Sequence, residues 1–330
     1  MQINSNVIRA TAISLVVFLH ISANSFASLG ENWWISLAYD SLTRASVPLF
    51  FMLSGALLLT KNEPAGIFYK KRLSKLIAPF LFWSYVYLVY RKYYVGESEI
   101  SLSPLTILNG PVYYHLWFLY SIISIYIFIP MLRYYTLNAT KQVKIIVLSL
   151  WFISQSIQPF ASIVGINLYT GIDAGLISRF LGFVLLGEFI ATTGREIDWR
   201  LLLAGFLAST AVTAFMTYNI SVISGTANET WFQYHSPIVI ISAVCLFMLL
   251  SRIKFSAGKV TKLISDFSFG IYFVHIIIMQ QISIRFIFKP ELFNSAWAIV
   301  LIPLAFILCI LLSLIVCVIF SKIPLLKKTI

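Results

Sequence analysis

The sequence predicts an all-α polytopic membrane protein with about ten transmembrane helices and both termini in the cytoplasm. The first observation is composition: 59% of the 330 residues are hydrophobic, only 11% are charged, and the mean hydropathy is +0.89. Soluble domains carry about 25% charged residues, so this chain is too apolar to be one. The second observation is a series of apolar stretches of membrane-spanning length, and the third is how the basic residues are distributed between them.

Each predicted helix is an apolar stretch of about 17 to 25 residues, the length that crosses about 30 Å of hydrocarbon. In chain order the ten stretches cover residues 8–29, 42–60, 76–94, 115–132, 143–163, 175–193, 200–219, 236–251, 263–287 and 296–320. The first stretch lacks the short apolar core and small-residue cleavage site of a signal peptide, so we expect it to be retained as a span.

The basic residues predict the orientation of these spans. If the amino terminus is cytoplasmic, 18 of the 24 Lys and Arg residues fall in cytoplasmic segments, as the positive-inside rule requires: Arg9, Lys61, Lys70, Lys71, Arg72, Lys75, Arg133, Lys141, Lys144, Arg195, Arg200, Arg252, Lys254, Lys259, Lys262, Lys322, Lys327 and Lys328. The opposite loops carry acidic residues: Glu31, Asp40, Glu97, Glu99, Asp173, Glu229 and Glu291. Topology therefore accounts for the net charge of +12, and we expect no nucleic-acid partner.

The motifs of soluble enzymes are absent from the sequence. Cys245, Cys309 and Cys317 lie in late apolar stretches without metal-ligand spacing, which predicts packing residues. No Gly-rich phosphate loop, HExxH pair or GxSxG elbow occurs. We therefore expect no metal site and no bound cofactor.

Ionisable residues inside the apolar stretches are the candidates for function, because a charge at membrane depth is costly. Arg9 and His20 are eleven residues apart, which places them within about 20° on one helix face and about 16 Å apart along its axis. His115, His235 and His275 also lie in, or at the start of, an apolar stretch. Two alternatives remain for such residues: a histidine that is hydrogen-bonded to a neighbouring helix, and an arginine that extends its charge to the membrane surface.

Several segments together resemble one family of membrane enzymes. They are the Arg–His pair of RATAISLVVFLH at 9–20, TRASVPLFFMLSG at 43–55, YKKRLSKLIAPF at 69–80, PVYYHLWFLYSIISIYIFIP at 111–130 and SFGIYFVHIII at 268–278. This combination resembles acyltransferase family 3, whose members acylate carbohydrates from a cytoplasmic acyl-CoA. It is most similar to the short branch that includes the enterobacterial common antigen O-acetyltransferase, as is ETWFQYHSP at 229–237. The resemblance implies one transmembrane domain over 1–330 and no appended soluble domain.

The resemblance also assigns roles to particular residues. Arg9 and His20 match the paired Arg and His that the family requires for acyl transfer, and Arg72 matches its basic cluster after the second span. The fourth-span motif matches at Trp117, Tyr126 and Pro130.

One position departs from the family pattern. Many relatives carry an acidic residue where this chain has Ile122. The role of that carboxylate is therefore absent here, or it belongs to another residue such as Asp40 or Glu188.

The chemistry of acyl transfer agrees with these assignments. Moving an acetyl group to a sugar hydroxyl needs a proton acceptor, and histidine has an unperturbed pKa of about 6.5, so His20 is the expected base. The phosphates of acetyl-CoA need cations, for which Arg9, Arg72 and Lys71 are the candidates. For the lysine, an ordinary positive-inside anchor is the alternative. Direct transfer and a covalent acyl-histidine intermediate both remain open.

Aromatic and polar side chains that suit a sugar are expected to bind the acceptor. The candidates are Asp40, Arg44, Tyr113, Tyr114, His115, Trp117, Trp231, His235 and His275. The alternative for any one aromatic residue is the interfacial belt that membrane proteins share.

We therefore expect a multi-pass O-acetyltransferase of the bacterial inner membrane. It would move an acetyl group from acetyl-CoA, its donor substrate, to a hydroxyl of a surface polysaccharide or of its lipid-linked precursor. A glycan or lipid transporter is the main alternative, although the sequence has no internal repeat of the transporter kind. A non-catalytic membrane scaffold would leave the Arg–His pair unexplained.

Overall fold

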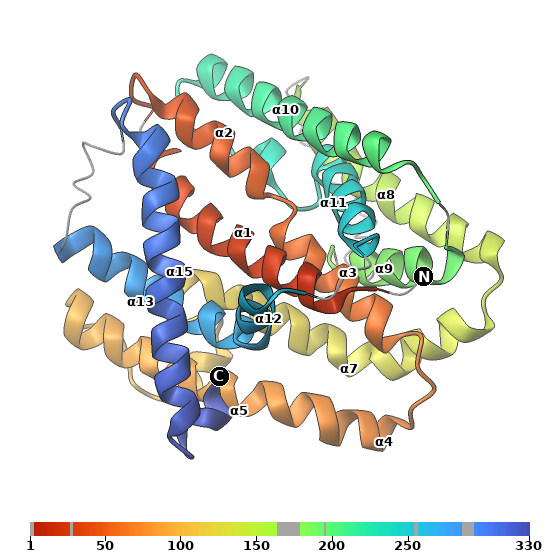
Figure 1. The fold of residues 1–330 in the computed structure, drawn as a ribbon, viewed down its shortest axis with the longest axis horizontal. Helices are drawn as coiled ribbons and strands as arrows, with labels where there is room; N and C mark the ends of the chain where they lie inside the picture. The colour runs from red at the N-terminus through yellow and green to blue at the C-terminus, as the bar shows by residue number, and fades with distance from the viewer. Residues whose placement is uncertain (1–2, 27–28, 164–178, 195, 254–256, 286–293) are drawn as a thin grey trace. The chain divides into compact units, whose positions relative to one another are not determined.

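The computed structural model describes residues 3–26, 29–163, 179–194, 196–253, 257–285 and 294–330, and every regular element within these ranges is a helix (Figure 1). Eight described segments are long and apolar enough to cross a membrane, and a ninth is counted if the bent pair α12 (Lys259–Asp266) and α13 (Ser268–Arg285) forms one span. The predicted all-α polytopic membrane fold is therefore confirmed.

The chain forms two compact units. Unit 1 comprises residues 1–57 and 139–316, and unit 2 comprises residues 58–138 and 317–330. Unit 1 contains α1 (Ser5–Phe26), α2 (Trp33–Thr43), α3 (Ser46–Leu58, except its last residue), α8 (Lys141–Ile163), α9 (Leu181–Thr193), α10 (Trp199–Ser224), η5 (Thr230–Phe232), α11 (Pro237–Ser251), α12, α13 and most of α15 (Ala298–Lys322). Unit 2 contains α4 (Ala65–Phe68), η1 (Tyr69–Leu73), α5 (Ser74–Tyr90), η2 (Arg91–Val95), α6 (Leu105–Leu108), η3 (Tyr114–Leu116), α7 (Trp117–Asn138) and η6 (Leu326–Thr329).

Two predicted spans differ from the structure. The stretch at 42–60 was expected to start after a loop, but the helical span covers Trp33–Leu58 because α2 precedes α3 directly. The polar residues of α2 lowered its hydropathy and concealed the helix. The stretch at 175–193 lies partly outside the described residues, and its described part is the 13-residue helix α9.

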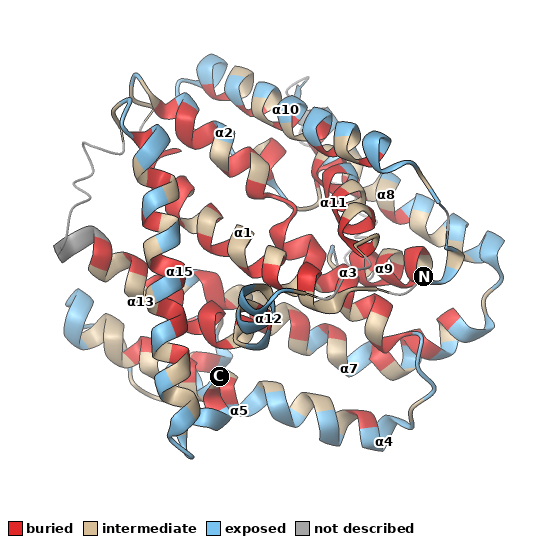
Figure 2. Ribbon diagram, viewed as in Figure 1, coloured by how far each residue is buried: buried red, intermediate tan, exposed pale blue. Residues whose placement is uncertain are grey.

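The surface of α10 shows why this fold belongs in lipid. Its buried face carries small hydroxyl residues at four-residue spacing: Ser209, Thr213, Thr217 and Ser221. Its outward face is largely apolar and exposed (Figure 2), with Leu201, Leu207, Val212, Phe215 and Val222 among the exposed residues. Small residues let helices approach closely inside a membrane, while lipid solvates the large apolar ones.

Two glycines bring α3 and α9 of unit 1 into close contact. A Cβ atom built on Gly55 would clash with the backbone of Val184, and one built on Gly187 would clash with the backbone of Met52. The two contacts are reciprocal, so each helix uses its glycine to admit the backbone of the other. Such close approach of backbones is typical of small-residue helix crossings in membranes.

A sharp bend separates α12 from α13, whose axes differ by 78°. The helix is interrupted at Phe267, where φ is −96° and ψ is 9°. The short α12 packs beside α1, and Ser265 donates a hydrogen bond to the side chain of Asn6 at 3.2 Å. Its lysines, Lys259 and Lys262, remain exposed.

In unit 2, α5 has a π-helical turn at each end, and such turns often mark functional sites. The first of these turns, η1, carries the basic cluster. The second turn begins at Arg91, which donates two hydrogen bonds to Oε2 of Glu97, at 3.0 and 2.5 Å. These bonds lower the pKa of Glu97 below its ordinary value. The indole of Trp83 on α5 donates to the Thr329 carbonyl at 2.8 Å and so fastens η6 to this helix.

Candidate active site

Helix α1 positions the two predicted catalytic residues. Arg9 and His20 both lie on it, and both are partly exposed. Eleven helical residues bring them to one face of α1, about 16 Å apart along the axis. One face of this helix therefore carries a cation near its first turns and a histidine much further along.

The ring of His20 packs against a second histidine, His275 of α13. The ring centroids are 5.3 Å apart and the ring planes are tilted by 34°. Nδ1 of His275 lies 3.0 Å from the Ile271 carbonyl, and Cys309 Sγ donates to the His275 carbonyl at 3.5 Å. His275 has no exposed surface, whereas the residue His20 is partly exposed.

A buried ion pair on α2 forms the next part of the site. Arg44 Nη2 donates to Asp40 Oδ2, and the two side chains are only 9% and 0% exposed. The other end of the guanidinium donates to the Phe232 carbonyl at 3.4 Å, and its carbon lies 3.9 Å from the Phe232 ring centroid, a cation–π contact. The prediction that Asp40 lies in an outer loop is therefore wrong. Its charge is buried because Arg44, one helical turn later, balances it.

Two polar atoms of this ion pair remain without a hydrogen bond inside the described part of the chain. They are Asp40 Oδ1 and Arg44 Nε, and both are buried. Almost all buried polar atoms in proteins are satisfied, so an unsatisfied one indicates a strained or functional position.

Electrostatic contacts join the ion pair to the histidines. Arg44 and His275 lie close enough to His20 to interact with it electrostatically. Tyr234 lies within the same kind of range of Arg44 and Asp40. The structure thus gathers residues from α1, α2, α13 and the segment after η5 into one polar cluster of unit 1. We refer to His20, Asp40, Arg44, Tyr234 and His275 as the histidine cluster.

The predicted acceptor residues of the 229–237 segment lie outside the histidine cluster. Trp231 is only 1% exposed, and its ring packs against Phe160 with centroids 5.6 Å apart. His235 is partly exposed, and its electrostatic contact is with Arg179. Phe232 instead belongs to a core cluster with Phe26. The prediction that Trp231 lies on a surface rim is therefore wrong. Its ring is buried because this part of the segment packs against the core.

The remaining predicted acceptor residues form an aromatic group in unit 2. His115 is 2% exposed, and its ring lies 4.8 Å from that of Tyr87 and 5.8 Å from that of Tyr113. Tyr114 is 51% exposed, and Trp117 is partly exposed. Of the predicted acceptor set in this unit, Tyr113, Tyr114 and Trp117 therefore present some surface, whereas His115 does not.

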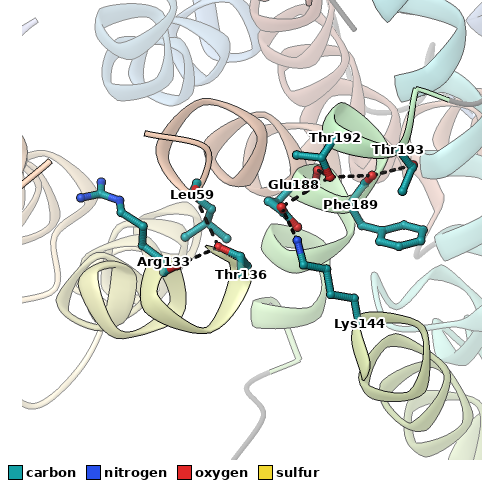
Figure 3. Close-up of polar contacts among 8 residues, drawn as sticks. All are labelled: Leu59, Arg133, Thr136, Lys144, Glu188, Phe189, Thr192 and Thr193. Carbon is teal, nitrogen blue, oxygen red and sulfur yellow. Dashed lines mark hydrogen bonds and ion pairs between the residues drawn. The ribbon is translucent and has the colours of Figure 1, made fainter. Parts of the chain in front are cut away.

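The basic segment of unit 2 is held in place by a buried arginine. Arg133 donates from Nε and Nη2 to the Leu58 carbonyl at 3.1 and 3.0 Å, and from Nη1 to the Glu63 carbonyl. The Glu63 carboxylate in turn accepts from Lys71 at 3.1 Å. Arg72, in the same turn as Lys71, is partly exposed. Thr136, one turn after Arg133, donates to the Leu59 carbonyl at 3.4 Å (Figure 3).

One family model matches nearly the whole chain. The family model described as an acyltransferase domain, that of acyltransferase family 3, matches residues 3–322. The chain belongs to this family. No curated protein and no solved structure matches the chain significantly. The protein is therefore a membrane acyltransferase, and the matched region covers most of both units.

In this acyltransferase Glu188 is part of a different ion pair. Lys144 of α8 lies 2.7 Å from Glu188 Oε1 on α9, and Thr192 donates to the same oxygen at 3.4 Å (Figure 3). The Glu188 side chain is 4% exposed. Many relatives carry an acidic residue at the position of Ile122. Glu188 does not offer a free carboxylate in its place, because its side chain is already paired with a lysine.

The sequence did not reveal two contributors to the acyltransferase site. Phe232 and Tyr234 reach Arg44 from a segment almost 190 residues later in the chain, which no local periodicity indicates. The ETWFQYHSP run was the signal in the sequence, but it predicted acceptor roles only for Trp231 and His235. Selecting the residues between them would have found both contacts.

Proposed function

We propose that this acyltransferase moves an acetyl group from cytoplasmic acetyl-CoA to a hydroxyl of a cell-surface polysaccharide or of its lipid-linked precursor, in the inner membrane of a bacterium. The observation that carries the proposal is His20, a histidine on a membrane-spanning helix whose ring packs against that of His275, in a chain with an acyltransferase domain. The likeness to the branch that includes the enterobacterial common antigen O-acetyltransferase supports the choice of acetyl group and glycan.

His20 acts as the general base. A ring nitrogen takes the proton of the acceptor hydroxyl while the hydroxyl oxygen attacks the thioester carbonyl. The C–S bond then breaks, and the proton passes from His20 to the CoA thiolate, so that the products are an acetyl ester and free CoA thiol. In the competing mechanism His20 itself attacks the thioester, and the hydroxyl takes the acetyl group from it in a second step.

The donor docks at the cytoplasmic end of α1. Arg9 lies about 16 Å from His20, a distance that an extended pantetheine arm suits, and a guanidinium binds phosphate in a bidentate manner. Arg72 and Lys71 of η1 are proposed as further donor-binding residues because their basic cluster resembles that of the family. Arg133 supports them by fixing the turn whose Glu63 binds Lys71.

The acceptor hydroxyl binds next to the Asp40–Arg44 pair. Asp40 Oδ1 and Arg44 Nε are buried and make no hydrogen bond within the described residues, so an acceptor hydroxyl admitted to this position would donate to the first and accept from the second. Arg44 also brings a positive charge toward the oxyanion that forms during the transfer. In unit 2, Tyr114 and Trp117 present aromatic surface of the kind that packs against sugar rings.

Mass spectrometry of surface glycans tests this function. Cells that lack the gene should lose one acetyl substituent, and the wild-type gene should restore it. The His20→Ala gene should not restore it, because a positioned base contributes roughly 10²–10⁴-fold. Glycans that are identical in all three strains would contradict the proposal, and a change in glycan amount without a change in acetylation would favour transport.

A further inference from the structure

We propose that α12 is an interfacial helix that binds the headgroups of anionic phospholipids through Lys259 and Lys262. The surface concerned is the exposed side of α12, just before the bend that leads into α13. The inference goes beyond the proposed function, because it concerns the membrane around the acyltransferase and needs neither the donor nor the acceptor of acyl transfer.

The eight residues of α12 form three arcs around the helix axis, at about 100° per residue. The first arc, about 40° wide, holds Thr261 and Ser265. The second arc is apolar and spans about 100°, with Val260, Leu263 and Ile264. The third arc spans about 60° and holds the charged residues, Lys259, Lys262 and Asp266. Separate apolar and charged faces on one helix are typical of a helix that lies in the membrane interface.

The first arc attaches α12 to the beginning of α1. Ser265 is buried, and its hydroxyl donates to the Asn6 side chain, in the first turn of α1, at 3.2 Å. The apolar span of α1, Ser5–Ala23, has 19 residues. At about 1.5 Å per residue it is about as long as the hydrocarbon core is thick. Its first turn, and α12 beside it, therefore lie near the level of the headgroups.

The bend after α12 agrees with this depth. The axes of α12 and α13 differ by 78°. Helices that cross a bilayer are tilted by about 20° on average from the membrane normal. With α13 as the crossing member of the pair, α12 lies closer to the plane of the membrane than to its normal.

The apolar arc of α12 is exposed. Val260 is 69% exposed and Leu263 is 40% exposed, while Ile264 is partly exposed. An interfacial helix buries such side chains at the boundary between headgroups and acyl chains. A soluble nucleotide such as CoA offers phosphates but little apolar surface to cover this arc. The arc therefore favours a lipid as the partner of the neighbouring lysines.

The charged arc carries the cations that would contact the headgroups. Lys259 and Lys262 are exposed, and a lysine keeps its ammonium in the polar layer while its stem lies along apolar surface. Asp266 is exposed one turn after Lys262 and offsets part of their charge. The helix retains a net positive charge, which favours an anionic headgroup over a zwitterionic one.

Quenching of a fluorophore on α12 tests the inference with the purified full-length protein in liposomes. The native cysteines are replaced by alanine, Val260→Cys is labelled with bimane, and the liposomes contain phosphatidylcholine and phosphatidylglycerol. In one preparation only the phosphatidylcholine carries brominated acyl chains, and in the other only the phosphatidylglycerol does. The two quenching values should show phosphatidylglycerol enriched roughly fivefold around α12, as expected for a net positive charge near an anionic lipid.

Charge variants should change this enrichment in opposite directions. Lys259→Gln with Lys262→Gln should remove the enrichment, because no cation of α12 then contacts the headgroup. Asp266→Asn should increase it, because the carboxylate repels an anionic lipid. Bimane on Phe215→Cys, at the exposed apolar face of α10, is the control and should be quenched equally by the two lipids.

Three results would overturn the inference. Bimane on Val260→Cys that neither lipid quenches would place α12 outside the membrane interface. Equal quenching by the two lipids would exclude selective binding of the anionic headgroup. Unchanged enrichment in the double lysine variant, with a raised KM for acetyl-CoA, would assign the lysines to the donor. The quenching requires no acyl transfer, so a protein that transfers no acetyl group would refute the proposed function alone.

Discussion

Replacing Lys144 by methionine removes the cation from the ion pair that joins α8 to α9. The Lys144 Nζ to Glu188 Oε1 distance is 2.7 Å, and the side chains are 14% and 4% exposed. At an effective dielectric constant of about 20, unit charges at this distance attract by about 6 kcal/mol, while desolvation opposes most of this gain. The intact pair is therefore worth little, but Lys144→Met leaves a buried carboxylate uncompensated. Such a loss costs about 3–5 kcal/mol, which lowers the folding equilibrium constant by roughly two to four orders of magnitude.

The assay is reversible unfolding of the detergent-solubilised protein, followed by circular dichroism. Glu188→Leu alone should be destabilised to a similar extent, because it leaves the lysine unpaired. The double variant Lys144→Met with Glu188→Leu should recover most of the stability, since an apolar pair of similar volume often replaces a buried ion pair without loss. Lys141→Met, an exposed lysine on the same helix, should change stability by less than about 0.5 kcal/mol and serves as the control.

The same variants decide whether Glu188 has a role in acyl transfer. The folded double variant should retain acetyl transfer, because we assign Glu188 to the contact between α8 and α9. Additive losses of stability in the double variant would refute the ion-pair reasoning. A stable double variant without activity would show that Glu188 supplies the carboxylate that Ile122 lacks.

Three further predictions follow from other parts of the structure. Gly55→Ala should destabilise the protein by about 1–3 kcal/mol or more in the same unfolding assay, because the added Cβ would clash with the α9 backbone. Gly66→Ala, at a position with open space, should cause no loss of stability. Equal effects of the two variants would contradict the close helix crossing. Arg9→Lys should raise the KM for acetyl-CoA by about tenfold, because a lysine ammonium makes one charge-assisted hydrogen bond to phosphate fewer than the arginine does. An unchanged KM would show that Arg9 is only a cation at the helix end. With the native cysteines replaced by alanine, Ser98→Cys should react with an impermeant thiol reagent from outside and Thr140→Cys should not, and the reverse pattern would invert the proposed topology.

The sequence predicted the membrane fold because apolar span length depends on composition alone, without knowledge of tertiary contacts. The exception was α2, whose helix was missed because Asp40 and Arg44 reduce its hydropathy. The two side chains neutralise each other one turn apart, so the segment can be buried despite its charges. A search for ion pairs at i,i+4 within polar interruptions of apolar stretches would have found it.

The candidate site was predictable to the extent that it lies on one helix. Arg9 and His20 follow from helical spacing along α1. The partner of His20 did not, because the contact with His275 joins residues 255 positions apart and depends on how α1 packs against α13. Trp231 and Phe232 show the same limit, since adjacent aromatic residues in one sequence run have different packing partners. The sequence indicated that aromatic residues lie near the site. Which of these aromatic residues contact the site depends on tertiary packing.

Transfer of radiolabelled acetyl from acetyl-CoA to a glycan acceptor by purified protein in liposomes tests the central claim most directly. The account predicts time-dependent label in the glycan with the wild-type protein. It predicts a roughly 10²–10⁴-fold lower rate with His20→Ala, in a variant that keeps wild-type stability. Transfer at the wild-type rate by a folded His20→Ala protein would contradict the claim that His20 is the base of this acyltransferase.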